Sequence, residues 1–369
     1  MKNLNKVLLV ASLLAIVVLP GVLANNVGMD ITPNIGTEKF APLVWMCNDR
    51  LVLDDNTEPG RVSGPGSPMF ERKNNYAFEG EKIIWKVLVM DKNGIEKIKD
   101  VFITLGSSQG AGNSIEANCR LDHVLTADES VDSSCNARIL EQQLSTIGYN
   151  NVAAYYTCEL TVESANSMYG EYWATVEAQD LDDLSGTMAE NEYWFFNPVI
   201  SLDINGALSF DNVRPGTTAY SSTLTIGNNA DSGSGVLLDM FISGTDFYDT
   251  SSSGAKCPTS NQLSLSAFRY FATSGAYSTR TDLGIGRGAR VKDNEGYVGI
   301  GYGTGFNTPT PFYNGYEILQ GAPADSYGLY PGNTLTPGAK MSLTFKLNLP
   351  EPCNGNFDSG KIYFWGEAV

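Results

Sequence analysis

The segment "KIIWKVLVMD", residues 82–91, decides the fold class of this chain. Every second side chain is apolar, and these side chains share one face of an extended backbone: Ile83, Trp85, Val87 and Val89. The same period of two recurs in "DVFITLG" (residues 100–106) and in "MSLTFKLNL" (residues 341–349). Alternation over short segments that end in turn residues is typical of half-buried strands. The sequence therefore predicts an all-β protein.

Further strands of this kind fill both halves of the chain. "YYTCELTV", "GEYWATVEAQD" and "NEYWFF" continue the pattern in the first half, and "AYSSTLTIGN" and "VLLDMFISG" continue it in the second. A length of 369 residues suggests two domains. Asn197-Pro198 interrupts an aromatic strand and marks the border. We expect an Ig-like β-sandwich over residues 42–198 and a second sandwich, Ig-like or jelly-roll, over residues 199–369.

One segment of the first half departs from the strand pattern. In residues 133–148, "SSCNARILEQQLSTIG", apolar residues recur at helical spacing: Ala137, Leu140, Leu144 and Ile147. Ser134 is a suitable N-cap residue. We expect one short helix in the first domain.

The N-terminus has the features of an export signal. Two basic residues, Lys2 and Lys6, precede the apolar run "VLLVASLLAIVVLPGVLA" (residues 7–24), which Pro20-Gly21 breaks. Small residues before Asn25 suit a signal peptidase, so residues 1–24 are predicted to be a signal peptide, although an uncleaved anchor is the alternative. Residues 25–41 then form an extended segment, either a disordered tail or a strand for pairing. The sequence after residue 24 contains no second apolar stretch of this kind, so we expect no transmembrane segment in the mature chain.

Charge and cysteine content agree with export. The net charge is −17, and loss of Lys2 and Lys6 with the signal peptide would make it more negative, which argues against binding nucleic acid. Six cysteines, an even number, fit disulfides in an extracellular, oxidising compartment. If pairs stay within a domain, Cys257 joins Cys353. The four cysteines of the first half then allow three pairings: Cys47, Cys119, Cys135 and Cys158.

Two acidic loops are the candidate site. "AQDLDDLSG" (residues 178–186) carries three aspartates before a glycine, and "MDKNGIEKI" (residues 90–98) follows the first quoted strand. If their strands are the B and F strands of an Ig-like sandwich, both loops lie at the same end. Calcium binds clustered oxygen ligands in tight turns, so five residues become possible ligands: Asp91, Asn93, Asp180, Asp182 and Asp183. Ordinary polar turns are the alternative reading.

Catalytic chemistry finds little support. His123 is the only histidine, and no G-x-S-x-G motif accompanies it. Glu190 and Glu192 lie on one strand face rather than across a cleft, which disfavours a glycoside hydrolase. Aromatic residues in "EYWFF" and "KIYFWGEA" leave a carbohydrate-binding module as an alternative, although they also suit a core and a domain interface. The glycine-rich run through Gly299, Gly301 and Gly303 indicates close packing of a strand rather than a phosphate loop.

Long stretches of the chain carry a resemblance. "YAFEGEKIIWKVLVMDKNGIEKIKDV", "SMYGEYWATVEAQDLDDLSG" and "ENEYWFFNPV" resemble the Ig-like half of uncharacterised secreted archaeal cell-surface proteins. "DNVRPGTTAYSSTLTIGNNADSGSGVLLDMFISGTDF" and "LPEPCNGNFDSGKIYFWGEA" look like their C-terminal half. More distantly, the run around Pro215-Gly216 and Asn228 is similar to sandwich modules of TasA-like fibre subunits. The first resemblance implies a surface protein without assigning it an activity.

From these features the sequence predicts a secreted, non-catalytic cell-surface protein with a structural, adhesive or assembly role. Its partners would be cell-surface proteins, further copies of itself, or surface glycans. No cofactor is expected apart from calcium. A carbohydrate-binding module and, less favoured, a secreted glycoside hydrolase are the competing functions.

Overall fold

The computed structural model describes residues 32–53, 68–69, 72–135, 151–189, 192–251, 254–281, 291–303, 316–320, 324–325 and 328–369. The chain divides into two units, Met1–Lys39 and Phe40–Val369. In the first unit, residues 32–39 form neither helix nor strand and are exposed. The predicted signal peptide and the predicted helix after Cys135 lie outside the described residues.

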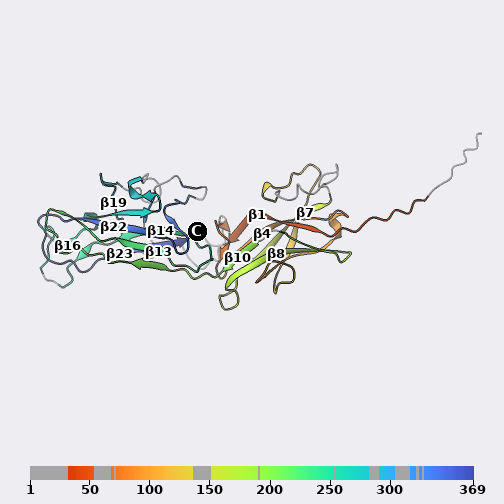
Figure 1. The fold of residues 1–369 in the computed structure, drawn as a ribbon, viewed down its shortest axis with the longest axis horizontal. Helices are drawn as coiled ribbons and strands as arrows, with labels where there is room; N and C mark the ends of the chain where they lie inside the picture. The colour runs from red at the N-terminus through yellow and green to blue at the C-terminus, as the bar shows by residue number, and fades with distance from the viewer. Residues whose placement is uncertain are drawn as a thin grey trace, which may run out of the picture. The chain divides into compact units, whose positions relative to one another are not determined.

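Ten strands occupy the first half of the second unit (Figure 1). They are β1 (Leu43–Leu53), β2 (Pro68–Met69), β3 (Tyr76–Ala77), β4 (Lys82–Met90), β5 (Ile98–Gly106), β6 (Ile115–Val124), β7 (Ala153–Thr161), β8 (Gly170–Asp180), β9 (Ser185–Thr187) and β10 (Glu192–Phe196). Their pairing order is β2-β1-β4-β7-β6-β5-β8-β10-β3, with β9 beside β8. β6 pairs with β5 through its first residues and with β7 through its last, so one strand connects two layers.

The core between these layers is built from the predicted strand faces. Ile83, Trp85, Val87 and Val89 of β4 are fully buried in one cluster. The rings of Trp85 and Trp194 meet edge to face in this cluster, with centroids 5.6 Å apart. Burial of the inward residues explains why alternation specified these strands: the buried apolar surface stabilises the fold, and a shift by one residue would expose it.

The second half contains thirteen further strands. They are β11 (Leu202–Asn205), β12 (Thr218–Tyr220), β13 (Leu224–Asn228), β14 (Leu238–Gly244), β15 (Phe247–Tyr248), β16 (Gln262–Leu263), β17 (Phe268–Ser274), β18 (Tyr277–Ser278), β19 (Val298–Gly299), β20 (Tyr316–Glu317), β21 (Thr334–Leu335), β22 (Lys340–Asn348) and β23 (Ile362–Ala368). One sheet runs β11-β13-β22-β17-β18, and another places β14 between β20 and β21 on one side and β23 on the other. All seven residues of β14 are buried, as its apolar sequence predicts.

One expectation about the second half is wrong. The alternation in "AYSSTLTIGN" predicts that Tyr220 and Ser222 share the inward face of Leu224 and Ile226. Instead the segment splits into β12 and β13, and Tyr220 is 52% exposed. Its hydroxyl donates to Glu295, at 2.9 Å, and its ring lies near the ammonium group of Lys346. These polar contacts hold Tyr220 on the surface.

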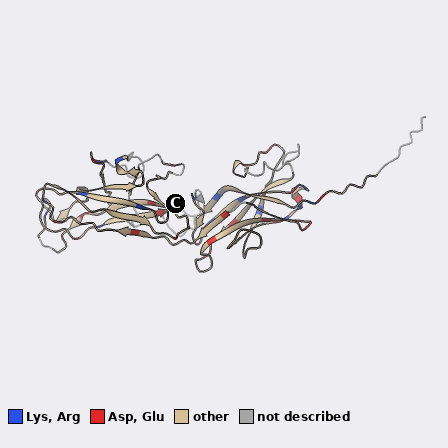
Figure 2. Ribbon diagram, viewed as in Figure 1, with Lys and Arg blue, Asp and Glu red and all other residues tan. Residues whose placement is uncertain are grey.

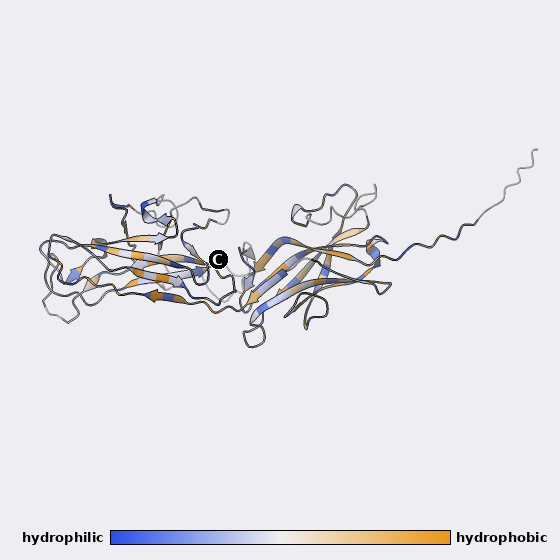
Figure 3. Ribbon diagram, viewed as in Figure 1, coloured by the Kyte–Doolittle hydropathy of each residue, from blue (hydrophilic) through white to orange (hydrophobic). Residues whose placement is uncertain are grey.

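The described strands of the two halves do not pair with one another. β10 ends at Phe196 and β11 begins at Leu202, close to the predicted border at residue 198. Tyr76 and Phe195 of the first half nevertheless belong to the same apolar cluster as the core of the second half. The division into two domains, and the Ig-like type of the first, therefore stay predictions. Hydrophobic and hydrophilic residues alternate along many strands of both halves (Figure 3).

All six cysteines are paired. Cys257 is bonded to Cys353, the pair expected from the partition between halves. In the first half Cys47 is bonded to Cys135 and Cys119 to Cys158, one of the three pairings that the sequence left open. The bonded cysteines are 88, 39 and 96 positions apart in the sequence. A disulfide that closes a longer loop restricts the unfolded chain more. Among the described helical segments, none has the length and apolar character required to cross a bilayer.

Candidate functional site

The two acidic loops lie at the same end of the first half, as the sequence predicts. β5 follows the first loop and pairs antiparallel with β8, which precedes the second loop, and Ile98 lies opposite Asp180. The Leu181 amide donates to the Lys97 carbonyl at 2.8 Å. We call Asp91, Glu96, Asp180 and Asp182 the acidic loop end. Pairing of β5 with β8 brings these residues together.

Asp91 and Asp180 are the buried members, only 1% and 2% exposed. Oδ1 of Asp91 accepts a hydrogen bond from the Asn93 amide at 2.7 Å. Oδ2 of Asp91 is also buried but accepts no hydrogen bond from the described residues. Oδ1 of Asp180 accepts two bonds, from the amides of Asp182 (2.9 Å) and Leu184 (2.7 Å). Asp180 therefore stabilises its own turn, whereas Oδ2 of Asp91 has no hydrogen-bond partner among the described residues.

The surroundings of Asp91 disfavour its ionised form. Burial is the main cause of a raised pKa of the Asp91 carboxyl, and the negative charges of Asp180, Glu96 and Asp182 raise this pKa further. The hydrogen bond from the Asn93 amide opposes these effects but does not cancel them. A carboxyl group that is buried beside other acids either takes up a proton or gains from a nearby cation.

Two of the five predicted calcium ligands, Asn93 and Asp183, make other contacts. The Asn93 side-chain oxygen accepts a bond from the Phe40 amide at 2.7 Å. Asp183 has a φ of 61° and lies on the outside of its turn, where its carboxylate is 3.3 Å from Lys99 Nζ. Glu96 lies near enough to Asp91 for its charge to raise the pKa of that carboxyl. The Glu96 carboxylate also approaches Gly94, whose φ of 119° favours glycine. The described residues contain no group of three acidic, histidine or cysteine side chains arranged to hold a metal ion.

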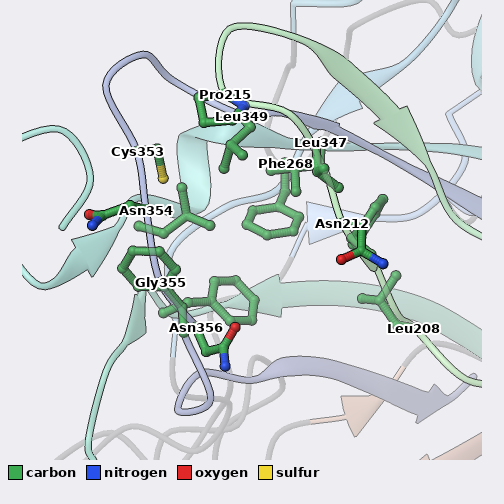
Figure 4. A pocket seen from close by; sticks show the side chains of 15 residues that line it. Leu208, Asn212, Pro215, Phe268, Leu347, Leu349, Cys353, Asn354, Gly355 and Asn356 are labelled. Carbon is green, nitrogen blue, oxygen red and sulfur yellow. The ribbon is translucent and has the colours of Figure 1, made fainter. Parts of the chain in front are cut away.

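A second feature is a pocket of about 570 Å³ in the second half (Figure 4). Most of its lining residues are apolar, and three asparagines lie among them: Leu208, Phe210, Asn212, Val213, Pro215, Phe247, Leu263, Phe268, Leu347, Leu349, Cys353, Asn354, Gly355, Asn356 and Phe357. The Phe268 ring lies tilted against the Phe247 ring, with centroids 4.7 Å apart, and contacts Phe210 edge to face. Figure 4 shows the Phe268 ring between Asn212 and the loop that carries Asn354 and Asn356.

The pocket was not foreseen, because its residues come from segments that lie far apart in the sequence. Each segment reads locally as a strand end or a turn. The lining has no charged side chain. Its size falls within the range of small-molecule sites, and its combination of aromatic walls with exposed amides suits a neutral ligand that has both apolar and hydrogen-bonding faces.

The groups considered for catalysis have structural contacts. His123 is half exposed, and its ring nitrogens face Asp122 at 3.2 Å and Glu129 at 3.5 Å. Glu192 is buried and binds Arg50 through both carboxylate oxygens, while Oε1 also accepts from the Trp194 indole. Glu190, the other half of the carboxylate pair, lies outside the described residues. Gly301 packs against the Tyr316 ring, 2.5 Å from the position a Cβ would take, in agreement with a packing role.

Basic residues are spread along the ribbon rather than gathered on one element (Figure 2). The strongest ion pairs are internal. Arg72, for example, binds Glu81 through two hydrogen bonds, and both side chains are buried.

Comparisons with known proteins give only remote likenesses. No protein-family model matches the chain, and no curated protein matches it. Among solved structures, the C-terminal domain of the Streptococcus pyogenes antigen I/II-family protein AspA aligns with 11% identity, 90% and 97% coverage of the two chains and a TM-score of 0.30. The C-terminal domain of the Streptococcus agalactiae antigen I/II polypeptide BspA aligns with 9% identity, 89% and 97% coverage and a TM-score of 0.30.

A chaperone–tip adhesin complex of CFA/I fimbriae biogenesis aligns with 11% identity, 89% and 92% coverage and a TM-score of 0.22. Scores this low establish neither a shared fold nor a shared role. The functional argument therefore rests on the residues of this chain.

Proposed function

We propose that this chain is an exported, non-catalytic protein of the cell surface with a structural or adhesive role. The observation that carries the proposal is the pairing of all six cysteines in disulfides within an all-β framework. Disulfides of this kind persist outside the reducing cytoplasm. The export signal predicted for residues 1–24 supports the same conclusion.

The test is recovery of the protein from its native cells. Intact cells are labelled with a reagent that does not cross membranes, the protein is isolated, and its N-terminus and thiols are analysed by mass spectrometry. We expect surface labelling, a mature chain that begins at Asn25 and no thiol that reacts with maleimide under denaturing conditions. An unlabelled chain with six reactive thiols would contradict the proposal.

We propose further that the acidic loop end binds calcium and that the ion stabilises the first half. The support is the buried Asp91 oxygen that lacks a hydrogen-bond partner among the described residues, together with the acids around it. Asp91, Asp180 and Asp182 would hold the ion, with water and backbone carbonyls completing the coordination, since three side chains alone are not arranged for it. Asp180→Ala with Asp182→Ala should abolish any rise of the melting temperature in calcium, whereas Asp183→Ala should keep it.

The pocket favours a second candidate function, binding of a neutral glycan. Sugar rings present apolar CH faces, which stack on aromatic walls, and hydroxyl groups, which pair with amides such as those of Asn212, Asn354 and Asn356. A glycan array with neutral and charged sugars tests it. We expect neutral hits that Asn356→Ala weakens and that Asn205→Ala, outside the pocket, leaves unchanged. An array without hits, or with charged sugars alone, would remove this candidate.

A further inference from the structure

The last strand of the chain, β23, has one edge that no described strand covers. β23 pairs antiparallel with β14 over its whole length, from Ile362 opposite Gly244 to Ala368 opposite Leu238. β20 and β21 pair with the other edge of β14, so β23 ends this sheet. An uncovered edge presents backbone donors and acceptors to a further strand.

The register shows which residues present them. The Thr245 amide donates to the Lys361 carbonyl at 2.9 Å, and the Val369 amide donates to the Leu237 carbonyl at 3.0 Å. Odd-numbered residues of β23 therefore make the ladder to β14. In an antiparallel sheet the alternate residues direct their backbone groups to the opposite edge. Those residues are Ile362, Phe364, Gly366 and Ala368.

The central part of β23 lacks the charges and prolines that usually protect an edge strand. From Ile362 to Gly366 it contains neither charge nor proline, and it is rich in aromatic residues. The longer strand β1 is different, because β2 pairs with its last residues and a bulge between Met46 and Arg50 interrupts its register with β4. The edge strand β11 has only four residues, and its Asp203 binds Lys340. β23 is thus an unusually open edge.

We propose that β23 pairs antiparallel with β23 of a second copy of this chain. In a two-fold arrangement centred on Phe364, Lys361 of each copy lies opposite Glu367 of the other. Tyr363 lies opposite Trp365, and Ile362 opposite Gly366. The even-numbered residues then form the hydrogen-bonded pairs that the register requires, and the odd-numbered residues form the closer side-chain pairs.

Charge complementarity selects this register among the antiparallel ones. A shift of two residues in either direction keeps the hydrogen-bonding pattern but separates Lys361 from Glu367. The centred register gains two opposite-charge pairs and two tyrosine–tryptophan pairs on one face. Tyr363 and Trp365 already stack within one copy, with centroids 6.2 Å apart, so they present a formed aromatic surface. Strand addition of this kind supplies affinity through backbone hydrogen bonds and specificity through side chains.

The experiment measures self-association of residues 25–369 by sedimentation velocity over a roughly hundredfold concentration range. We expect a monomer–dimer equilibrium. Lys361→Glu and Glu367→Lys should each weaken it by about tenfold or more, because two attractive pairs become repulsive. The double variant restores the opposite charges and should restore dimerisation. Lys256→Glu and Glu351→Lys, which make the same charge changes at exposed sites outside β23, should leave it unchanged.

Hydrogen exchange identifies the contact directly. In the dimer, the amides of Ile362, Phe364, Gly366 and Ala368 should exchange more slowly as the protein concentration rises. A protein that stays monomeric overturns the proposal, as does a dimer that ignores the charge swap and leaves these amides unprotected, or one held together by a different strand. The inference does not depend on cell-surface location: a cytoplasmic protein could show the same dimer, and a surface protein could lack it.

Discussion

Replacement of Asp91 by asparagine tests the energetics of the acidic loop end. The amide oxygen of asparagine can still accept the bond from the Asn93 amide, so the turn is retained. The substitution removes the negative charge from a buried side chain whose second oxygen has no hydrogen-bond partner among the described residues. The Nδ2 group of asparagine is buried there as well, so the gain comes from the lost charge and not from a new hydrogen bond. Without calcium at pH 7, Asp91→Asn should therefore raise the free energy of unfolding, because burial and the neighbouring acids disfavour the ionised carboxylate that it replaces.

The pH dependence has a definite sign. The pKa of Asp91 is raised in the folded protein above its unfolded value of 3.8, so ionisation of Asp91 disfavours folding. This penalty is absent below the unfolded pKa and becomes complete as the pH rises above the folded pKa. The stability difference between Asp91→Asn and the natural protein should therefore vanish at about pH 3 and grow toward pH 7.

The assay is thermal unfolding followed by circular dichroism, in EDTA and in calcium, with Asp183→Asn as the matched control. A gain of 1 kcal/mol corresponds to roughly 2–4 °C for a cooperative unit the size of one half of this chain. Calcium should stabilise the natural protein and the control but not Asp91→Asn. An Asp91→Asn protein that melts lower in EDTA at pH 7, or a difference that does not change with pH, would refute the reasoning.

Three further predictions concern stability alone. Asn228→Ala should lower the free energy of unfolding by about 2–3 kcal/mol in urea titrations, because the buried Asn228 side chain donates to two carbonyls and accepts from one amide; a loss below ~1 kcal/mol would contradict this account. Arg72→Met should lower the free energy of unfolding by about 3–5 kcal/mol, because it leaves the buried Glu81 carboxylate without its cation. A double variant with Glu81→Leu should recover much of that loss. A double variant that is equally unstable would show that the loss comes from packing. The hydrogen bond from Lys86 holds the pKa of Asp132 at about 2. The stability that this pair contributes is therefore present above pH 3.8 and is lost as the pH falls toward 2. Asp132→Asn should make the free energy of unfolding less dependent on pH in that window, and an unchanged pH profile would exclude a contribution from the pair.

Local sequence patterns determined the strands of this protein and the end at which its acidic loops meet. Alternation is a property of the extended backbone, so the inward faces of β4 and β22 follow from the residues themselves. Asp91 lies near Asp180 because β5 pairs with β8, a neighbourhood that we expected from an assumed Ig-like strand order. Tyr220 departs from the pattern: the strand is interrupted after it, and its side chain contacts Glu295 and Lys346 on the surface.

Only the tertiary structure decided which distant segments became neighbours. The partner of Cys47 depends on where the turn around Cys135 lies against β1, a contact between residues 88 positions apart. The pocket likewise gathers residues from Leu208 to Phe357, none of which signals a ligand alone. The open edge of β23 exists because β20 and β21 take the other side of β14. The alternation of apolar and polar residues indicates which face of a strand is buried. It does not indicate which strands become neighbours. Strand neighbours, and hence sheet edges and cavities, result from long-range packing that no local pattern encodes.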